Sequence, residues 1–372
     1  MSEAEKYTYE PLRLSRSIED TKVRLIELLP ETKCKMIACN MHCFSLSDCP
    51  QYVAISYTWG SPLVIKEMRI NNKQFYVREN LWWCLYNMRT SQRWRFLWID
   101  ALCINQDDIP ERNRQVPRIS LIYTAAMTVV VWLGSATDES NLAIDYIVQK
   151  GCKPLQAKGD GFRQIWSKQH GRAVLDLCER PYWTRVWIIQ EVMMAQYIIF
   201  LCGDKSFEWR DINYIFKNLK RIANHIHVEH HRYVAAVLAS PGGSIIEQKR
   251  QWNALPLEGQ TFTLKHLLKQ YRNQRSTEIR DKVYALLGLT NLNDPNPTKH
   301  QIYVDYSKPV EDIYRDVLQS IWSSDQFATE EEILYISNIL QQALRLDSAS
   351  EIVQYETNRA VNRSNFVPPL DQ

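Results

Sequence analysis

The sequence predicts an α/β fold, in which a mostly parallel sheet is flanked by helices and followed by a mainly helical C-terminal region. In the first 204 residues, short apolar runs alternate with stretches of helical periodicity, a pattern typical of parallel strands joined by helical crossovers. From about residue 205 the segments become longer and amphipathic, which predicts helices. The 372 residues are long for one domain, so we expect one domain over 1–204 and a second over 205–372, packed on the first.

Four short runs rich in β-branched and aromatic residues predict the strands of the sheet. They occupy residues 52–58, 96–100, 127–133 and 197–203. Sites in parallel α/β sheets form at the carboxyl ends of the strands. We therefore expect chemistry in the loops after Thr58, Asp100 and Gly134.

Helices are expected between these strands. Residues 111–126 have apolar side chains at helical spacing, and we expect Pro117 to bend or restart this helix. Residues 135–179 form a looser segment that we interpret as an insertion. The stretch RPYWTRVWIIQEVMMA at 180–195 predicts a further helix, and the tail, about 358–372, is expected to be poorly ordered.

Composition and charge exclude several classes of protein. The chain has 45 Lys and Arg residues and 42 Asp and Glu residues, which gives a net charge of 45 − 42 = +3. The basic residues are scattered, so we expect no nucleic-acid partner. The first residues contain no apolar signal-peptide core, and no uncharged apolar run reaches 18 residues. These features predict neither secretion nor a membrane span, and cytoplasmic residence is the default expectation.

Two groups of metal-ligand residues invite a zinc interpretation. Four cysteines lie close together around a histidine, at Cys34, Cys39, Cys43 and Cys49 with His42, but their spacing fits no CxxC site. Apolar residues at 37, 39, 41 and 43 alternate as one face of a strand would, which favours a structural role. The histidines at 225, 227, 230 and 231 are better explained as an exposed polar helix. We expect no metal and no cofactor.

Several long motifs together resemble the heterokaryon incompatibility (HET) domain of filamentous fungi. They are YVAISYTWG at 52–60, LWIDALCINQDDIPERNRQV at 97–116, IYTAAMTVVVWLG at 122–134 and RPYWTRVWIIQEV at 180–192, while RDKVYALLGL at 280–289 resembles the segment that commonly follows the domain. Members of this family trigger programmed cell death when genetically different fungal cells fuse. The resemblance implies a role in self/non-self recognition or innate immunity.

The order of strands and motifs is more distantly similar to the Toll/interleukin receptor (TIR) domain, which has a flavodoxin-like sheet. Enzymatic TIR domains cleave NAD at the nicotinamide–ribose bond, and the glutamate of their W-x-x-x-E helix is catalytic. By this resemblance Trp187 matches the tryptophan and Glu191 the catalytic glutamate. The insertion at 135–179 and the TWG that ends the first motif depart from the TIR pattern.

The residues around Glu191 are compatible with such chemistry. On one continuous helix, Trp183, Trp187 and Glu191 would share an edge beside the core, which leaves the acid partly solvated. No basic residue lies three or four positions away, so a raised pKa is expected. A carboxylate can stabilise the ribosyl cation that forms as nicotinamide leaves. Alternatively, Glu191 accepts backbone N–H bonds or pairs with a distant arginine in a structural role.

Other residues are weaker candidates for contact with the nucleotide. Ser56, Tyr57 and Trp59 come at the end of the first strand, although Trp59 packed against the Gly60 turn is the structural alternative. Arg185 belongs to the RPYWTRVW motif and, with Trp187, completes the predicted ligand contacts there.

The loop after the second strand supplies the last candidates. Asp100 could bind a ribose hydroxyl or cap the following turn. Asn105 and Gln106 could contact the ligand, but bracing of the loop by their amides is favoured. Cys103 invites a nucleophile interpretation, which lacks a histidine that can be placed beside it.

Two hypotheses about function follow. The first is an NAD glycohydrolase, with NAD as substrate, that self-association activates and that kills the cell by depleting NAD. The second is a non-enzymatic signalling module that uses the same fold to bind itself or a partner incompatibility protein.

Overall fold

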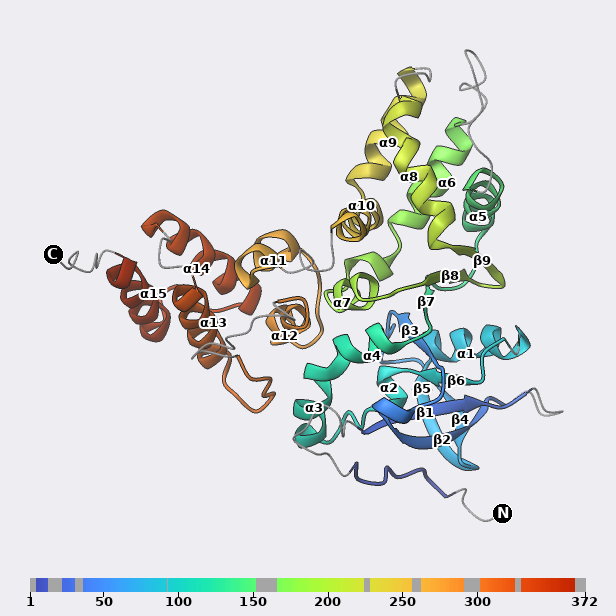
Figure 1. Cartoon of the computed structure of the whole chain (residues 1–372), viewed down its shortest axis with the longest axis horizontal. Coiled ribbons are helices and arrows are strands. Elements are labelled where there is room, and N and C mark those ends of the chain that lie inside the picture. Colours follow the sequence, from blue (N-terminus) through green and yellow to red (C-terminus); the bar gives the residue numbers. More distant parts are fainter. Residues whose placement is uncertain are drawn as a thin grey trace. The chain divides into compact units, whose positions relative to one another are not determined.

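The chain forms two compact units in the computed structural model (Figure 1). The structure describes residues 5–12, 22–30, 36–91, 93–151, 166–223, 228–255, 262–290, 302–324 and 329–364. Unit 1 consists of Met1–Asp107, Leu121–Thr184 and Glu191–Ala254, and unit 2 of Asp108–Ser120, Arg185–Gln190 and Leu255–Gln372. Residues 205–254 thus group with the sheet, and the proposed sequence domains 1–204 and 205–372 stay a prediction.

Unit 1 is built on one nine-stranded sheet. In spatial order the strands are β5 (Lys73–Arg78), β4 (Ile65–Ile70), β2 (Ala38–Ser45), β1 (Lys22–Leu28), β6 (Phe96–Trp98), β3 (Val53–Tyr57), β7 (Thr128–Trp132), β8 (Ile198–Cys202) and β9 (Lys205–Glu208). The four strands predicted from sequence are β3, β6, β7 and β8, and all four are confirmed. They are adjacent and mutually parallel.

The parallel strands lie in the spatial order β6-β3-β7-β8, so the first of them in the chain stands between the second and the third. This is the order 2-1-3-4 of flavodoxin-like sheets, whose ligand crevice lies where the order reverses. Here that point is between β3 and β7. The α/β expectation is therefore confirmed, while the strand pairs β1–β2, β1–β6, β4–β5 and β8–β9 are antiparallel and make the whole sheet mixed.

Every residue of β3 and of β7 is buried, because helices or other segments cover both faces of the sheet. Ser56 pairs with Val131 and Tyr57 with Trp132. Successive side chains of a strand point to opposite faces, so Ser56 and Tyr57 serve different sides of the sheet. Ser56 and Tyr57, both predicted to contact a ligand, therefore cannot line the same surface.

The alternation predicted around the cysteines belongs to β2. Ile37 and Cys39 are buried as expected of a core face, whereas Met41 is half-buried and Cys43 is exposed. Cys34 lies outside the described residues, and so do the side chains of all four clustered histidines.

Helices complete unit 1. They are α1 (Glu79–Ser91), α2 (Asp100–Cys103), α5 (Asp138–Gly151), α6 (Lys168–Cys178), α8 (Trp209–Ala223), α9 (Val228–Ala239) and α10 (Pro241–Ala254), with the 3₁₀ helices η1 (Leu46–Asp48) and η4 (Pro181–Thr184). Helices α5 and α6, from the predicted insertion 135–179, pack against each other and against α8 and α9. Residues 152–165 of that insertion lie outside the described residues.

Unit 2 contains α3 (Ile109–Gln115), η2 (Val116–Arg118), α11 (Leu264–Tyr271), α12 (Asp281–Leu287), α13 (Val310–Ser324), α14 (Glu330–Leu344) and α15 (Glu351–Ser364). Pro117 lies in η2, between α3 and α4 (Ile119–Ala125), so the expected restart of this helix is confirmed. Helix α15 extends into the expected tail, whose last residues, 365–372, lie outside the described residues.

The helix predicted over 180–195 is wrong in extent. The stretch forms η4, then an irregular turn, and only then α7 (Ile188–Met193). The interruption has a backbone cause, because Arg185 forms an isolated bridge with Arg275 and Val186 N–H donates to the Arg275 carbonyl. Those hydrogen bonds replace the ones that a continuous helix would make.

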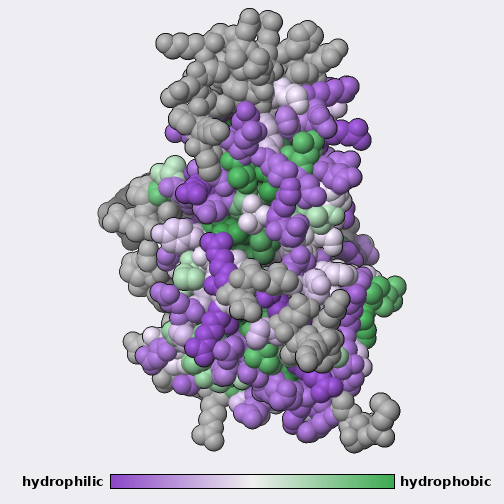
Figure 2. All heavy atoms as spheres, turned by 90° about the vertical axis from the view of Figure 1, so that its right-hand side faces the viewer, coloured by the Kyte–Doolittle hydropathy of each residue, from purple (hydrophilic) through white to green (hydrophobic). Residues whose placement is uncertain are grey.

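Most of the molecular face drawn in Figure 2 is hydrophilic, with a few hydrophobic side chains among the polar ones. The most exposed large apolar residue in the described part of the chain is Leu63, at 90% exposure, in the loop between β3 and β4. Among the described residues, no helix combines the length and apolar character needed to cross a bilayer.

Candidate functional site

Glu191 is buried in α7, with 4% of its surface exposed, and its carboxylate accepts a hydrogen bond from the Ser56 hydroxyl. The Tyr182 hydroxyl oxygen lies 2.6 Å from the Ser56 oxygen. Because the single Ser56 proton is used on Glu191, Tyr182 donates to Ser56. The three side chains therefore form a directed chain from Tyr182 through Ser56 to Glu191.

This hydroxyl–carboxylate chain lies at the sheet position where ligands of flavodoxin-like folds bind. Ser56 is the penultimate residue of β3 and pairs with Val131 of β7, so it lies near the carboxyl end of both strands. Helix α7 and η4 bring Glu191 and Tyr182 to the same point. The sequence predicted Ser56 and Glu191 for one site, and the structure brings these two together.

The carboxylate is more deeply buried than the sequence suggested. One continuous helix would leave Glu191 partly solvated, but the break before Ile188 removes the shared edge of Trp183, Trp187 and Glu191 on which that expectation rested. A hydroxyl donor on a buried carboxylate stabilises its ionised form. Chemically, the chain can hold a negative charge or pass a proton between oxygen atoms.

A buried lysine fixes the end of α7. The Lys249 ammonium group, on α10, donates to the carbonyl oxygens of Met193 and Ala195, each at 2.9 Å. Only 3% of Lys249 is exposed, and burial lowers its pKa to about 8. Carbonyls at a helix C-terminus lack intrahelical partners, so this cation caps α7 and holds Glu191 in position.

The loop after β6 is braced by its own side chains. The indole N–H of Trp59 donates to Asp100 at 2.9 Å, and the second Asp100 oxygen accepts from Ala101 N–H at 2.7 Å. The Gln106 amide donates to the Asp100 carbonyl at 3.0 Å, and the Asn105 side chain accepts from Asp107 N–H at 3.3 Å. These contacts match the capping and bracing alternatives, while contact of these residues with a ligand stays a prediction.

On the opposite face of the sheet, Asn80 of α1 links the ends of β3 and β7. Its amide donates to the Thr58 carbonyl at 2.5 Å and accepts from the Trp132 indole at 3.0 Å. Tyr57 is 2% exposed and lies on this face with Trp132. Tyr57 is thus separated by the sheet from the Glu191 carboxylate, and its predicted ligand contact stays a prediction.

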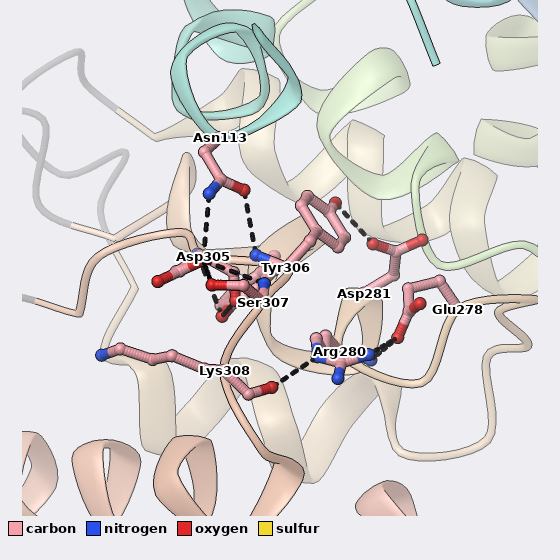
Figure 3. A network of polar contacts seen from close by, with 9 residues as sticks. Asn113, Glu278, Arg280, Asp281, Asp305, Tyr306, Ser307 and Lys308 are labelled. Carbon is pink, nitrogen blue, oxygen red and sulfur yellow. Dashed lines mark hydrogen bonds and ion pairs between the residues drawn. The ribbon is translucent and has the colours of Figure 1, made fainter. Parts of the chain in front are cut away.

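Trp187 serves a different carboxylate, in unit 2. Its indole hydrogen-bonds Asp281 on α12. The Tyr306 hydroxyl donates to the same carboxylate at 2.8 Å, as Figure 3 shows. Burial raises the pKa of Asp281 to about 6, although both hydrogen bonds act in the opposite direction. The Arg112 guanidinium lies 4.0 Å from the centre of the Tyr306 ring.

The rest of this network fixes the segment that precedes α13. Asn113 donates to Asp305 at 3.0 Å and accepts from Tyr306 N–H at 2.9 Å. Arg280 donates to the Lys308 carbonyl at 3.0 Å and to Glu278 at 2.7 Å, as Figure 3 shows. These contacts join α3, α12 and the 305–308 segment within unit 2, and this structural role accounts for them without a ligand.

The last two residues that the sequence singled out are Arg185 and Cys103. Arg185 is half-buried in the turn that interrupts the predicted helix, and its role with a ligand stays a prediction. Burial raises the pKa of the Cys103 thiol to about 12, so the thiol stays protonated at neutral pH and is a poor nucleophile.

Sequence reasoning missed three functional candidates. Tyr182 stood in the RPYW motif, but nothing in the sequence pairs it with a serine 126 positions away. Lys249 and Asp281 belong to amphipathic helices, where a charged residue is ordinarily expected at the surface. A signal for Asp281 was present, because it lies in the RDKVYALLGL segment that resembles the family.

Comparison with known proteins identifies the domain that carries the Glu191 site. Residues 52–191 match the family model described as "Heterokaryon incompatibility protein (HET)". This range begins just before β3 and ends at Glu191. Residues 52–191 are therefore similar to the HET domain, and four of the sequence motifs that resemble this family lie in or overlap that range.

One curated relative is "Heterokaryon incompatibility protein 6, OR allele" from Neurospora crassa. It is 26% identical over 344 residues, an alignment that covers 76% of this chain and 49% of the relative. The chain thus spans about half the length of that protein. No solved structure matches the chain, so the similarity to TIR domains stays a prediction.

Proposed function

We propose that this protein acts in fungal self/non-self recognition and programmed cell death by hydrolysing NAD to nicotinamide and ADP-ribose. The observation that carries the proposal is the Glu191 carboxylate, which is bound to Ser56 at the carboxyl end of β3, where the parallel strand order reverses. The HET domain and the Neurospora relative support the incompatibility role.

In the proposed reaction, water attacks C1′ of the nicotinamide ribose. The glycosidic C–N bond breaks, its electron pair neutralises the pyridinium nitrogen, and the proton of the attacking water is released. Glu191 stabilises the positive charge that develops on the ribosyl group and accepts the proton. Nicotinamide leaves as a neutral molecule, so the reaction needs no second acid for the leaving group.

The burial of Glu191 adds a conformational requirement. Ser56 is fully buried and Glu191 is 4% exposed, so a substrate reaches the carboxylate only after the Ser56–Glu191 contact opens. We assign this opening to self-association or to a partner incompatibility protein, which makes the protein inactive until it is assembled. An enzyme that destroys NAD needs such a restraint in a resting cell.

Incubation of the concentrated protein with NAD tests the proposal. We expect nicotinamide and ADP-ribose to appear in equal amounts, at a rate that rises more steeply than in proportion to protein concentration. Absence of nicotinamide both in concentrated solution and after artificial dimerisation through a fused dimer tag would contradict the enzymatic proposal.

The alternative function is a non-enzymatic signalling module that uses the same fold to bind partners. A specific observation favours it, because Trp187 and Glu191, the two residues of the W-x-x-x-E pattern, both have internal hydrogen-bond partners. On this alternative, cells die without a loss of NAD. Measurement of cellular NAD before viability falls separates the two functions.

A further inference from the structure

Arg180 lies between α6 and η4, two residues before Tyr182. Its Nη1 donates to the carbonyl oxygens of Leu133 and Ser135, each at 2.9 Å. These residues begin the loop after β7, the strand next to β3. The guanidinium group is therefore fixed at the same strand ends as the Ser56–Glu191 contact.

The loop that binds Arg180 requires a glycine and is tied to the neighbouring strand. Gly134 has a φ of +103°, and a Cβ added there would lie 3.4 Å from Arg180 Nη1. The Gly134 carbonyl also accepts from Gly203 N–H at 3.0 Å, which ties the loop to the end of β8. The two loop carbonyls thus hold one nitrogen of Arg180, and the guanidinium is positioned in advance of any ligand.

The charge of Arg180 is not neutralised locally. Across the residues that the structure describes, no carboxylate forms an ion pair with Arg180, and its hydrogen bonds use only Nη1. The side chain is half-buried, and Nη2 and Nε of the positively charged guanidinium remain available as donors. Two donors of one guanidinium match two oxygens of a phosphate.

A second polar group lies at the end of the neighbouring strand. The Thr58 hydroxyl oxygen is buried and has no hydrogen-bond partner among the described residues. Thr58 follows Tyr57, which pairs with Trp132, while Leu133 follows Trp132. The Thr58 hydroxyl thus follows the end of β3, and the Arg180 guanidinium is bound to the loop that follows the adjacent strand β7. Buried polar groups without partners are uncommon, which suggests a ligand role for Thr58.

We propose that Arg180 binds a phosphate group of a nucleotide whose ribose reaches Glu191. The placement of that ribose rests on the proposed function, whereas the phosphate contact rests on Arg180 itself. A dinucleotide with a pyridinium ring matches both charges, because its pyrophosphate meets the cation at β7 and its positive ring meets the carboxylate at α7. Arg180 thereby selects phosphorylated nucleotides over nucleosides.

Calorimetric titration of the full chain tests this contact without any need for turnover. The ligands are ADP-ribose, inorganic pyrophosphate and adenosine, and the variants are Arg180→Met, Arg180→Lys and Arg172→Met. Arg172 is an exposed arginine of the neighbouring helix α6, so its variant is a matched control for loss of one positive charge. All titrations are made at one salt concentration.

We expect Arg180→Met to weaken ADP-ribose and pyrophosphate binding by at least about tenfold, the cost of a charge-assisted hydrogen bond, and to leave adenosine binding unchanged. Arg172→Met should bind all three ligands as the wild type does. Arg180→Lys keeps a donor for the loop carbonyls, so it should remain folded by thermal melting while it still loses paired contact with the phosphate.

Unchanged ADP-ribose affinity in folded Arg180→Met or Arg180→Lys would overturn the inference, as would a wild-type chain that binds neither ADP-ribose nor pyrophosphate. Failure of the proposed NAD hydrolysis has a different signature. In that case no nicotinamide forms, yet ADP-ribose still binds in an Arg180-dependent way, and the phosphate site stands.

Discussion

Glu191 in unit 1 is buried, and Asp281 in unit 2 is half-buried with a carboxyl group that is shielded from water. Both lie on short helices, yet their partners differ in kind. Glu191 accepts from Ser56, at the carboxyl end of a parallel strand, and Ser56 is backed by Tyr182. Asp281 is held by an indole and a phenol and lies within a network that joins helices to a connecting segment. Glu191 thus lies where α/β sheets bind ligands, whereas Asp281 holds helices and a connecting segment together.

The W-x-x-x-E pattern is divided between these two centres. Its tryptophan, Trp187, hydrogen-bonds Asp281, while its glutamate, Glu191, hydrogen-bonds Ser56. Two residues that are four positions apart in the chain thus have two different structural roles. A tryptophan and a glutamate at helical spacing are therefore not sufficient to define one site, and the two carboxylates need separate tests.

The largest difference between the two carboxylates is expected in living cells. Glu191→Gln should abolish cell killing and preserve cellular NAD, because an amide cannot stabilise a developing cation as a carboxylate does. Asp281→Asn should still kill when it accumulates to wild-type levels. The measurement is viability and cellular NAD after induced expression in a fungal host, normalised to protein level. Equal killing by wild type and Glu191→Gln would count against catalysis.

Asp281 should give a distinct dependence of stability on pH. Its pKa of about 6 in the folded chain exceeds the ordinary value of 3.8, so between pH 4 and 6 the folded chain retains a proton that the unfolded chain has released. Stability therefore falls as pH rises through this window, by up to about 3 kcal/mol for a shift of about two units.

The test is denaturant unfolding of wild type and Asp281→Asn between pH 4.5 and 7. The variant lacks the titrating group, so the stability difference between the two proteins should change across the window in the predicted direction. Parallel curves would show that Asp281 ionises with an ordinary pKa.

Lys249 allows a separate test of the Glu191 site, because it binds the end of the helix that carries Glu191. Its pKa is lowered from 10.5 to about 8, so between pH 8 and 10.5 the unfolded chain binds a proton that the folded chain does not. Stability from this group rises with pH through that window, by about 3 kcal/mol at most.

Lys249→Met should remove this rise in alkaline unfolding experiments. It should also lower NAD turnover, because the carbonyls of Met193 and Ala195 lose their cap. Lys249→Arg offers a cation for the same carbonyls and should restore part of the turnover. A Lys249→Met variant with the wild-type alkaline profile would contradict the assignment of a lowered pKa.

The smallest effect is expected at Tyr182. Tyr182→Phe removes one hydroxyl and leaves the Ser56 oxygen with its bond to Glu191. A net loss of about 1 kcal/mol in the free energy of unfolding is expected for one neutral hydrogen bond. Chemical denaturation measures it. A loss of several kcal/mol would mean that Tyr182, rather than Ser56, is the principal partner of the buried carboxylate.

The sequence was sufficient for the centre of the fold because β3 and β7 are continuous apolar runs, which is what strands buried on both faces require. It also placed Ser56 and Glu191 in one site, since the end of the first strand and the motif glutamate were both singled out. The alternation at residues 37–43 indicated β2, whereas strands β1, β4, β5 and β9 were not predicted, because no buried apolar run like those of β3 and β7 marks them.

The details around Glu191 could not be predicted, for a physical reason. Helical phase places side chains only while the helix continues, and the backbone hydrogen bonds between Arg275 and the 185–186 turn interrupt it. That pairing joins residues about 90 positions apart in the chain, a distance at which local periodicity carries no information. The partner of Trp187 and the burial of Glu191 both follow from this break.

The measurement that tests the central claim most directly is nicotinamide release from NAD by wild type and Glu191→Gln at equal, high concentration. Thermal melting of both proteins verifies that the variant is folded, and Asp281→Asn serves as the control for loss of a hydrogen-bonded carboxylate elsewhere in the chain. If Glu191 is catalytic, Glu191→Gln should be at least about 100-fold slower, and folded Asp281→Asn should have a rate near wild type. Equal rates in wild type and folded Glu191→Gln would contradict a catalytic role of Glu191.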